Sequence, residues 1–203
     1  ELSSFQLESC PSFRPLVAVY LNLTPDHLDR HGGMEQYGAA KENIFANQTA
    51  DDIAVLNYDD PLVAAVASRI ASRVLWFSLH HRPENGIYLD DERLRYLVAG
   101  EEKFSLAVAD IFIKGQHNIQ NVMAAFLASA SLGLNPESIA RAIISFRGVE
   151  HRLEYVKEAG GVIYVNDSKG TNPASTIQAI KAYEQPMILL LGGRNKGSDF
   201  REL

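Results

Sequence analysis

Cysteine, tryptophan and long apolar runs are all scarce in this chain. Its 203 residues include one cysteine and one tryptophan. A single thiol, that of Cys10, cannot form an internal disulfide, which excludes a small secreted scaffold held together by disulfides. No apolar run approaches the roughly 18 residues that a membrane-spanning helix needs, so we expect no membrane partner. The opening residues Glu1 to Ser4 also lack the features of a signal peptide, and a reducing cytoplasm is the expected location.

Basic residues are outnumbered by acidic ones. The chain has 19 lysines and arginines against 25 aspartates and glutamates, which gives a formal net charge of -6. Nucleic-acid-binding proteins neutralise phosphates with clustered lysine and arginine, so this balance argues against nucleic acid as a partner. Hydrophobic residues at 46% and charged residues at 22% are ordinary for a globular protein of this size. Any phosphate that the chain binds must therefore be held by local groups.

Short apolar runs alternate with helical patterns in the first 80 residues. The expected strands are 16–23, 53–56 and 74–77, and the expected helices are 34–47 and 61–70. Asp60 is placed as the N-cap of the second helix, with Pro61 at its first position. This alternation predicts an α/β fold with a largely parallel sheet.

The pattern changes after residue 80. Segments 86–89, 93–98 and 104–108 predict a small antiparallel ribbon. A helix from His117 to Leu132 should follow, and then a second helix with Asn135 as N-cap and Pro136 at its first position. The last part, with a strand at 161–166, a helix at 171–183 and a strand at 187–191, predicts a new βαβ unit of a Rossmann-like domain. We expect a domain boundary at about residue 148.

The segment 166–173 joins a predicted strand to a predicted helix through polar residues and glycine, with Asn172 as the cap of the helix and Pro173 at its first position. Free amides at the helix start, together with Lys169, would hold a phosphate or a carboxylate. Asp167 could accept a hydrogen bond from a ribose hydroxyl or bind a cation. The alternative is an ordinary capped turn, because capping alone also selects asparagine and threonine.

A second basic loop, 192–197, follows the next predicted strand and includes Arg194 and Lys196. Open parallel sheets bind their ligands in the crevice beyond the carboxyl ends of the strands, where this loop would lie. The loop is not a Walker A phosphate loop, because the required glycine spacing and Lys-Ser/Thr pair are missing. A turn with solvated Arg194 and Lys196 is the alternative interpretation.

The loop 22–31, with His27 and His31 among its residues, carries imidazole and carboxylate groups directly after a predicted strand. These are the residue types of metal sites and of acid–base catalysis, although a solvated polar loop has the same composition. Lys41 lies beside the apolar stripe of the next helix, where a lysine can simply extend its amine to solvent. If the amine is desolvated, its pKa falls, and the neutral form can react with carbon dioxide to give an anionic carbamate.

The segment 114–121 opens a long helix with Asn118 and Asn121 on one face. A pair of asparagine side chains can recognise the donor and acceptor edge of a purine. The alternative is that His117 or Asn118 caps the helix.

Taken together, these segments resemble the Mur ligase family in their order and spacing. The residues that carry the resemblance are 1–8, 22–31, Lys41, 115–121, 151–154 and 167–171, which span essentially the whole chain. Within the family, the opening Glu-Leu-Ser-Ser-Phe-Gln-Leu-Glu resembles the member that adds D-glutamate. The resemblance implies a central, P-loop-NTPase-like ATP-binding domain at 1–148 and the beginning of a C-terminal amino-acid-binding domain at 149–203.

The resemblance implies a role for each matching position. Glu1 and His27 would bind magnesium, and Lys41 would be the carbamylated lysine that supports a second magnesium ion. The implied nucleotide contacts are Asn118 and Asn121 for adenine, Arg152 for the phosphates and Asp167 for the ribose. The implied substrate contacts are Ser3, Lys169, Thr171 and Lys196, and the residues expected to act in catalysis are His27, Lys41 and Lys169.

The implied reaction is ATP-dependent formation of an amide bond. ATP would phosphorylate UDP-N-acetylmuramoyl-L-alanine, and D-glutamate would attack the acyl phosphate, in a protein expected to be a monomer. A phosphate loop and a domain for the UDP group would lie outside this chain, so we expect the isolated chain to be inactive. The alternatives are another Mur-type ligase, a folylpolyglutamate synthase-like enzyme, or a nucleotide-binding module without catalysis.

Overall fold

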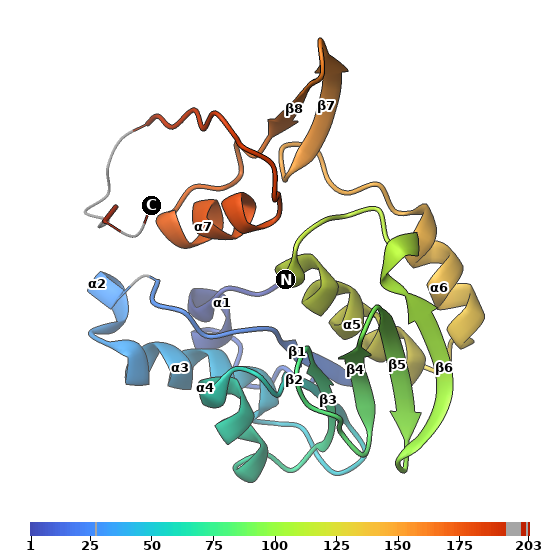
Figure 1. Cartoon of the computed structure of the whole chain (residues 1–203). Coiled ribbons are helices and arrows are strands. Elements are labelled where there is room, and N and C mark those ends of the chain that lie inside the picture. The colour runs from blue at the N-terminus through green and yellow to red at the C-terminus, as the bar shows by residue number, and fades with distance from the viewer. Residues whose placement is uncertain (27, 194–199, 202) are drawn as a thin grey trace.

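The computed structural model of the chain describes residues 1–26, 28–193, 200–201 and 203 (Figure 1). In order, the elements are α1 (Ser4–Glu8), β1 (Val17–Tyr20), α2 (Leu28–His31), α3 (Met34–Glu42), η1 (Asn43–Phe45), β2 (Ile53–Asn57), α4 (Pro61–Ala64), η2 (Ala65–Ser68), β3 (Arg73–Ser78), β4 (Gly86–Asp90), β5 (Arg93–Val98), β6 (Glu101–Ala107), η3 (Val108–Asp110), α5 (Gln116–Ser131), α6 (Pro136–Ser145), β7 (Glu154–Ala159), β8 (Val162–Asn166) and α7 (Pro173–Lys181). None of the helices in these ranges combines the length and apolarity needed to cross a membrane.

Strands β1 to β6 form one sheet in sequential order. The strands from β1 to β4 pair in parallel, and β4, β5 and β6 pair antiparallel, which confirms the mostly parallel α/β sheet. The expected antiparallel ribbon is not separate from that sheet, because β4 pairs with β3 at Gly86 and Trp76. A Cβ atom at Gly86 would overlap the Trp76 carbonyl group, so glycine permits this close pairing.

Alternate residues of the parallel strands face two separate apolar clusters. In β2, Ile53 and Val55 belong to one cluster and Ala54 and Leu56 to the other. Successive side chains of a strand point to opposite faces, so near-continuous apolar strands indicate a sheet that is covered on both sides. Helices α5 and α6 cover the first face, and α3, η1, α4 and η2 cover the second.

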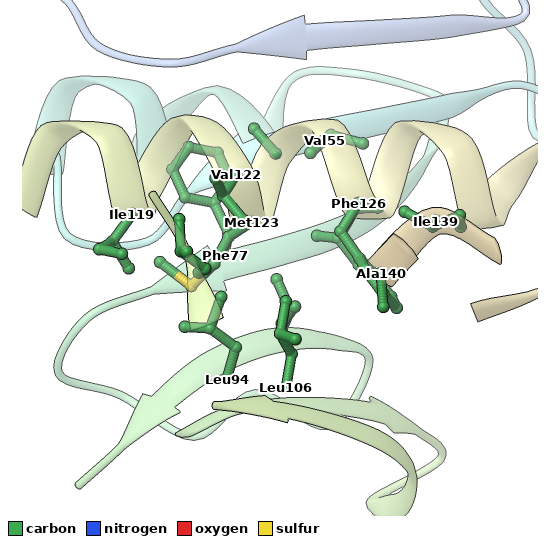
Figure 2. Packing of buried hydrophobic residues seen from close by; sticks show 14 residues of the cluster. Val55, Phe77, Leu94, Leu106, Ile119, Val122, Met123, Phe126, Ile139 and Ala140 are labelled. Atoms are coloured by element: carbon green, nitrogen blue, oxygen red, sulfur yellow. The ribbon is translucent and has the colours of Figure 1, made fainter. Parts of the chain in front are cut away.

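Helix α5 supplies the largest share of the first cluster. Figure 2 shows Val122, Met123 and Phe126 of this helix directed toward Phe77 of β3 and toward Leu94 of β5. The helix is as long as predicted and begins one residue earlier, at Gln116, and its alanine-rich sequence has high helix propensity. Burial of such side chains stabilises the fold by roughly 1.5–3 kcal/mol each, so these contacts hold α5, which also carries Asn118 and Asn121, firmly against the sheet.

Local capping signals in the sequence were read correctly. Asp60 accepts hydrogen bonds from Leu62 N at 3.0 Å and Val63 N at 3.2 Å. Asn135 caps α6 in the same way. The helix expected at 61–70 is shorter than predicted, since it changes to a 3₁₀ turn at Ala65.

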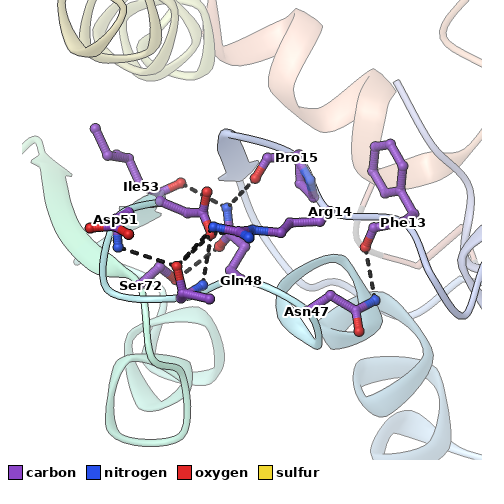
Figure 3. A network of polar contacts seen from close by, with 10 residues as sticks. Phe13, Arg14, Pro15, Asn47, Gln48, Asp51, Ile53 and Ser72 are labelled. Carbon is purple, nitrogen blue, oxygen red and sulfur yellow. Dashed lines mark hydrogen bonds and ion pairs between the residues drawn. The ribbon is translucent and has the colours of Figure 1, made fainter.

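A buried polar network fastens the segment before β1 to the loop before β2 (Figure 3). Arg14 Nε donates to Asp52 Oδ2 at 2.8 Å, and Gln48 Nε2 donates to Pro15 O at 2.9 Å and Ile53 O at 3.2 Å. The bonds from Arg14 to Asp52 and from Gln48 to Pro15 join residues more than 30 positions apart, so they fix the start of β1 against β2.

The last part of the chain departs from the predicted βαβ unit. Strand β8 and helix α7 form as expected, but β8 pairs antiparallel with β7, a strand that the sequence reading missed. The expected strand at 187–191 is not a strand in the described structure, and Ile188 and Leu190 are 93% and 91% exposed. A strand needs a neighbour for its backbone groups, and within the described ranges no strand pairs with this segment.

Candidate functional site

Hydrogen bonds between the loops that follow β1 and β2 position the predicted metal-binding loop. Asn57 Nδ2 donates to Leu21 O at 2.9 Å, and Leu23 N donates to Asp60 Oδ2 at 2.8 Å. These loops lie at the carboxyl ends of parallel strands, where α/β proteins bind ligands. Asp60 thus serves both as the cap of α4 and as an anchor for the loop that leads to α2.

Helix α1 begins with a reciprocal capping box. Ser3 Oγ accepts from Gln6 N at 3.2 Å, while Ser3 N donates to Gln6 Oε1 at 2.8 Å. The predicted ligand Glu1 lies exposed just before this cap. A capped helix start has a fixed backbone direction, so the capping box determines where Glu1 can reach.

His31 is buried at the junction of three helices. Its side chain is 2% exposed, and its Nε2 atom lies 2.9 Å from Ser4 Oγ. Its Nδ1 atom faces Glu8 Oε1 at 3.7 Å. The imidazole stacks on Phe5, with ring centroids 5.4 Å apart, and lies 5.3 Å from the Tyr37 ring. His31 therefore contacts α1 and α3 from its own place in α2.

Lys41 lies partly buried on α3, beside the stripe formed by Tyr37 and Ala40, as predicted. Its Nζ atom lies 5.3 Å from the centroid of the Tyr37 ring. Among the described residues, no carboxylate forms an ion pair with this amine. Burial raises the pKa of Tyr37, and the nearby Asp26 adds to the shift.

His27 falls outside the described residues, and without it no group of three histidine, cysteine or acidic side chains is arranged to hold a metal. The donor types nevertheless fit magnesium. Glu1 offers carboxylate oxygens, and a carbamate on Lys41 would add more, which are the hard ligands that this ion prefers.

Helix α5 is capped by a residue other than the two that the sequence suggested, His117 and Asn118. The N-cap is Gly115, and neither His117 nor Asn118 caps the helix. Asn118 is 8% exposed, and its Nδ2 atom donates to Lys114 O at 2.7 Å. Asn121 Nδ2 lies 3.4 Å from Asn118 Oδ1, and the Asn121 side chain is exposed. Of the two predicted adenine contacts, Asn118 thus orders the helix start and Asn121 faces outward.

The linker around Arg152 has an unusual backbone. His151 and Leu153 have φ angles of 67° and 45°, in the left-handed region that non-glycine residues rarely adopt. His151 N donates to Glu154 Oε2 at 2.8 Å, and Lys169 N donates to His151 O at 3.0 Å. These bonds hold the exposed Arg152 between two constrained residues.

Asp167 is tied to the same linker. Its Oδ1 atom accepts a hydrogen bond from Leu153 N at 3.0 Å, which orients the carboxylate. Its Oδ2 atom lies against Gly170, where a Cβ atom would collide with it. Asp167, the predicted ribose contact, is therefore held through its Oδ1 atom. The absence of a side chain at Gly170 leaves room beside its Oδ2 atom.

The charges of Arg152 and Asp167 both act on His117, at the start of α5. Burial lowers the pKa of the His117 imidazole, Asp167 opposes that shift, and Arg152 adds to it. Within the part of the chain that the structure describes, the buried Nδ1 atom of His117 has no hydrogen-bond partner. Burial also raises the pKa of Tyr183, at the end of α7, and Asp167 adds to it. Asp167 therefore influences one group at the start of α5 and one group beyond the end of α7.

His117 and Tyr183 were not among the residues predicted for this site. His117 was treated only as a cap, and no signal marked Tyr183, because a single aromatic residue at a helix end is ordinary core material. The predicted αβ turn did form, since Asn172 Oδ1 accepts from Ser175 N at 2.8 Å. Lys169 and Thr171 are exposed just before that cap. Lys196 lies outside the described residues.

One cavity, of about 510 Å³, lies away from the predicted residues. It is lined by Tyr58, Val74, Trp76, His80, His81, Arg82, Pro83, Glu84 and Asn85. His81 Nδ1 lies 3.2 Å from Asp59 Oδ1, which also accepts from Ser78 Oγ at 2.5 Å. These bonds shape the connection from β3 to β4, so the cavity is a feature of that turn.

The fold and its polar loops define the class of α/β proteins with ligand sites at the carboxyl ends of parallel strands. Residues 1–129 match the family model described as the Mur ligase middle domain. The chain belongs to the Mur ligase family.

Relatives at higher identity extend over the whole chain. It is 46% identical over 202 residues to the UDP-N-acetylmuramoylalanine–D-glutamate ligase of Pelotomaculum thermopropionicum, with 100% of this chain and 44% of that protein covered. Identity to the protein of that name from Clostridioides difficile is 48% over 203 residues, with 100% and 45% covered. The chain thus spans less than half the length of these curated relatives.

Solved structures share the fold at lower identity. The structure of MurF ligase from Thermotoga maritima in complex with ADP has a TM-score of 0.67 and 20% identity, covering 89% of this chain and 42% of that one. UDP-N-acetylmuramate-alanine ligase MurC from the same organism has a TM-score of 0.64 and 21% identity, covering 90% and 41%. Both confirm the predicted fold.

Proposed function

We propose that this chain is part of an ATP-dependent ligase that adds D-glutamate to UDP-N-acetylmuramoyl-L-alanine. The observation that carries the proposal is the match of residues 1–129 to the Mur ligase middle domain. The hydrogen bond from Leu153 N to Asp167 Oδ1, which orients this carboxylate at the linker that contains Arg152, supports a nucleotide site there. The full-length similarity to ligases of that name supports D-glutamate as the amino acid. Activity belongs to the longer protein, and the isolated chain is expected to be inactive.

The residues around α5 have distinct tasks in the proposed nucleotide site. Asn121 presents its amide to the adenine edge, while Asn118 orders the turn that carries it. Arg152 contacts the phosphates from its constrained linker. Asp167 accepts from a ribose hydroxyl through Oδ2, because Oδ1 is already bonded to Leu153 N. The division into a domain at 1–148 and a second at 149–203 is part of the same proposal.

The reaction proceeds through an acyl phosphate. A carboxylate oxygen of UDP-N-acetylmuramoyl-L-alanine attacks the γ-phosphorus of ATP, the bond to the bridging oxygen breaks, and ADP leaves. The neutral amine of D-glutamate attacks the acyl carbon, the carbon–oxygen bond to phosphate breaks, and the nitrogen loses a proton as the amide and inorganic phosphate form. Phosphorylation is needed because a carboxylate oxygen is a poor leaving group, whereas phosphate leaves readily from the acyl carbon.

Residues at two ends of the site neutralise the charge that develops. Lys169 and Thr171, just before the positive N-terminal end of α7, together with Lys196 bind the carboxylates of D-glutamate and the reacting phosphate. Glu1, His27 and a carbamylated Lys41 would hold magnesium, which stabilises negative charge on the phosphoryl group when it is bound. Ser3 belongs to the substrate side of this arrangement. A cytoplasmic, monomeric enzyme is part of the proposal.

The test uses the full-length protein. Phosphate release from ATP is measured with magnesium and UDP-N-acetylmuramoyl-L-alanine, with and without D-glutamate, and beside a Lys41→Ala variant. Release is expected to require D-glutamate and to fall at least about 100-fold in the variant, the scale of losing a key electrostatic group. Release that depends instead on another amino acid would indicate a different ligase of the family. Wild-type activity in the variant would refute the role of Lys41.

A further inference from the structure

The predicted magnesium residues lie on three separate segments. Glu1 precedes α1, His27 precedes α2, and Lys41 lies in α3. Helices α1 and α2 are both short, with five and four residues, and a helix of that length is not stable on its own in water. Tertiary contacts must therefore hold the first two segments in place against α3.

His31 provides these contacts. Its Nε2 atom reaches Ser4 Oγ on α1 at 2.9 Å, and its ring lies between Phe5 of α1 and Tyr37 of α3. Both partners are rings, at centroid distances within the favourable range of about 4.5–7 Å. One polar contact and two ring contacts limit the positions that this buried imidazole can take.

The same ring links His31 to Lys41. The Tyr37 ring contacts His31 and also lies close to the Lys41 amine. The Lys41 Nζ atom is 5.3 Å from the centroid of the Tyr37 ring. On the α1 side, Arg30 lies over the Phe5 ring at 5.6 Å and its guanidinium is 3.8 Å from Glu8. A continuous series of contacts thus runs from α1 through α2 to the lysine.

We propose that His31 is a positioning residue for the metal-binding end of the site. It acts by fixing the segment that begins with Glu1 relative to α3 and Lys41, and not by touching the metal. The inference rests on the proposed function, because it assumes that these segments bind a divalent cation together. The proton arrangement that satisfies both neighbours has N–H at Nδ1, facing Glu8, and Nε2 accepting from the Ser4 hydroxyl.

The experiment uses the full-length protein and Mn²⁺ alone as the probe, with free Mn²⁺ followed by electron paramagnetic resonance. His31→Phe keeps an aromatic ring but loses the hydrogen bond to Ser4, and should weaken Mn²⁺ binding roughly ten-fold, as for other groups that orient metal ligands. Ser4→Ala should weaken it roughly two- to ten-fold, the range of one hydrogen bond. His31→Gln, whose amide can still bond to Ser4, should bind more tightly than His31→Phe.

The matched control is His81→Phe, at an imidazole outside the site, which should leave Mn²⁺ binding unchanged. Mn²⁺ affinity in His31→Phe within two-fold of wild type, or no Mn²⁺ binding by the wild type, would overturn the inference. A thermal midpoint is recorded for each variant, and a His31→Phe protein that does not fold leaves the decision to Ser4→Ala under the same criterion. If the wild type binds Mn²⁺ but its phosphate release does not require D-glutamate, the proposed function fails, while the test of His31 by Mn²⁺ binding remains valid.

Discussion

Gly115 and Ala182 bring α5 and the end of α7 into contact. A Cβ atom placed on Gly115 would lie 3.1 Å from the Ala182 Cβ atom and 2.8 Å from His117 Cε1. The φ angle of Gly115 is 95°, in a region that is open mainly to glycine. Gly115 therefore meets two requirements at once, a special backbone conformation and a close approach.

Gly115→Ala should lower the free energy of unfolding by about 1–3 kcal/mol from backbone strain alone, with a further loss from the crowded neighbours. Urea unfolding of the variant and the wild type gives the difference. Gly133→Ala is the control, because Gly133 has a φ angle of 83° but nothing within 4 Å of its added Cβ. Equal losses in the two variants would show that α7 does not press on Gly115.

His117 should make stability depend on pH below neutrality. Burial lowers the pKa of its imidazole, so the folded protein favours the neutral form. The unfolded chain then binds more protons below the ordinary value of about 6.5, and stability is lost as the pH falls through that value. The thermal midpoint of the wild type should fall more steeply than that of His117→Asn between pH 7.5 and 5. Parallel curves would contradict this prediction.

The ion pair of Arg14 and Asp52 should act at the acidic end of the range. The hydrogen bond from Arg14 is the main cause that lowers the pKa of Asp52, and Thr49 N adds a second bond. A lowered carboxyl pKa contributes stability above the ordinary value of 3.8, and that contribution is lost as the pH falls through the folded value. Asp52→Asn should therefore be less stable than wild type at pH 7, and the gap should close below about pH 4.

The neighbouring residue offers a matched control for that experiment. Asp51 is exposed, and Asp51→Asn should leave the free energy of unfolding at pH 7 within about 0.5 kcal/mol of the wild-type value, as surface changes usually do. A loss as large as that of Asp52→Asn would mean that general charge, and not the pair with Arg14, is responsible.

Leu127 should be among the most sensitive core positions. Its side chain is fully buried in the cluster between α5 and the sheet. Leu127→Ala should reduce the free energy of unfolding by about 2–5 kcal/mol, because it removes apolar contacts and leaves a cavity. Leu132→Ala, at a residue that is 61% exposed, should change it by less than about 0.5 kcal/mol. Denaturant titration of both variants measures the two values.

Features determined by neighbouring residues could be read from the sequence. Asp60, Asn135 and Asn172 were identified as caps because a cap bonds to amides two or three residues away. Strands β2 and β3 were predicted at 53–56 and 74–77, each one or two residues shorter than observed, because a sheet covered on both faces needs uninterrupted apolar runs.

Features that depend on distant partners could not be read in this way. The parallel pairing of β3 with β4 joins the ribbon to the main sheet, and nothing within either strand encodes it. The contact of His31 with Ser4 spans 27 residues, so the loop 22–31 gave no sign that one of its imidazoles is buried. Pairing of β7 with β8 was missed because the six residues of β7, Glu-Tyr-Val-Lys-Glu-Ala, do not alternate regularly between apolar and polar side chains.

The exposed hairpin of β7 and β8 has a consequence for how the chain loses its structure. Val156, Ile163 and Tyr164 are 53%, 49% and 47% exposed, so this two-stranded sheet has little apolar cover. Two strands without a packed face are marginally stable, whereas β2 and β3 lie in the centre of a covered sheet. Backbone amides of β7 and β8 should exchange with deuterium long before those of β2 and β3. A single melting temperature for this chain would then report on the six-stranded sheet, while the hairpin opens and closes on its own timescale.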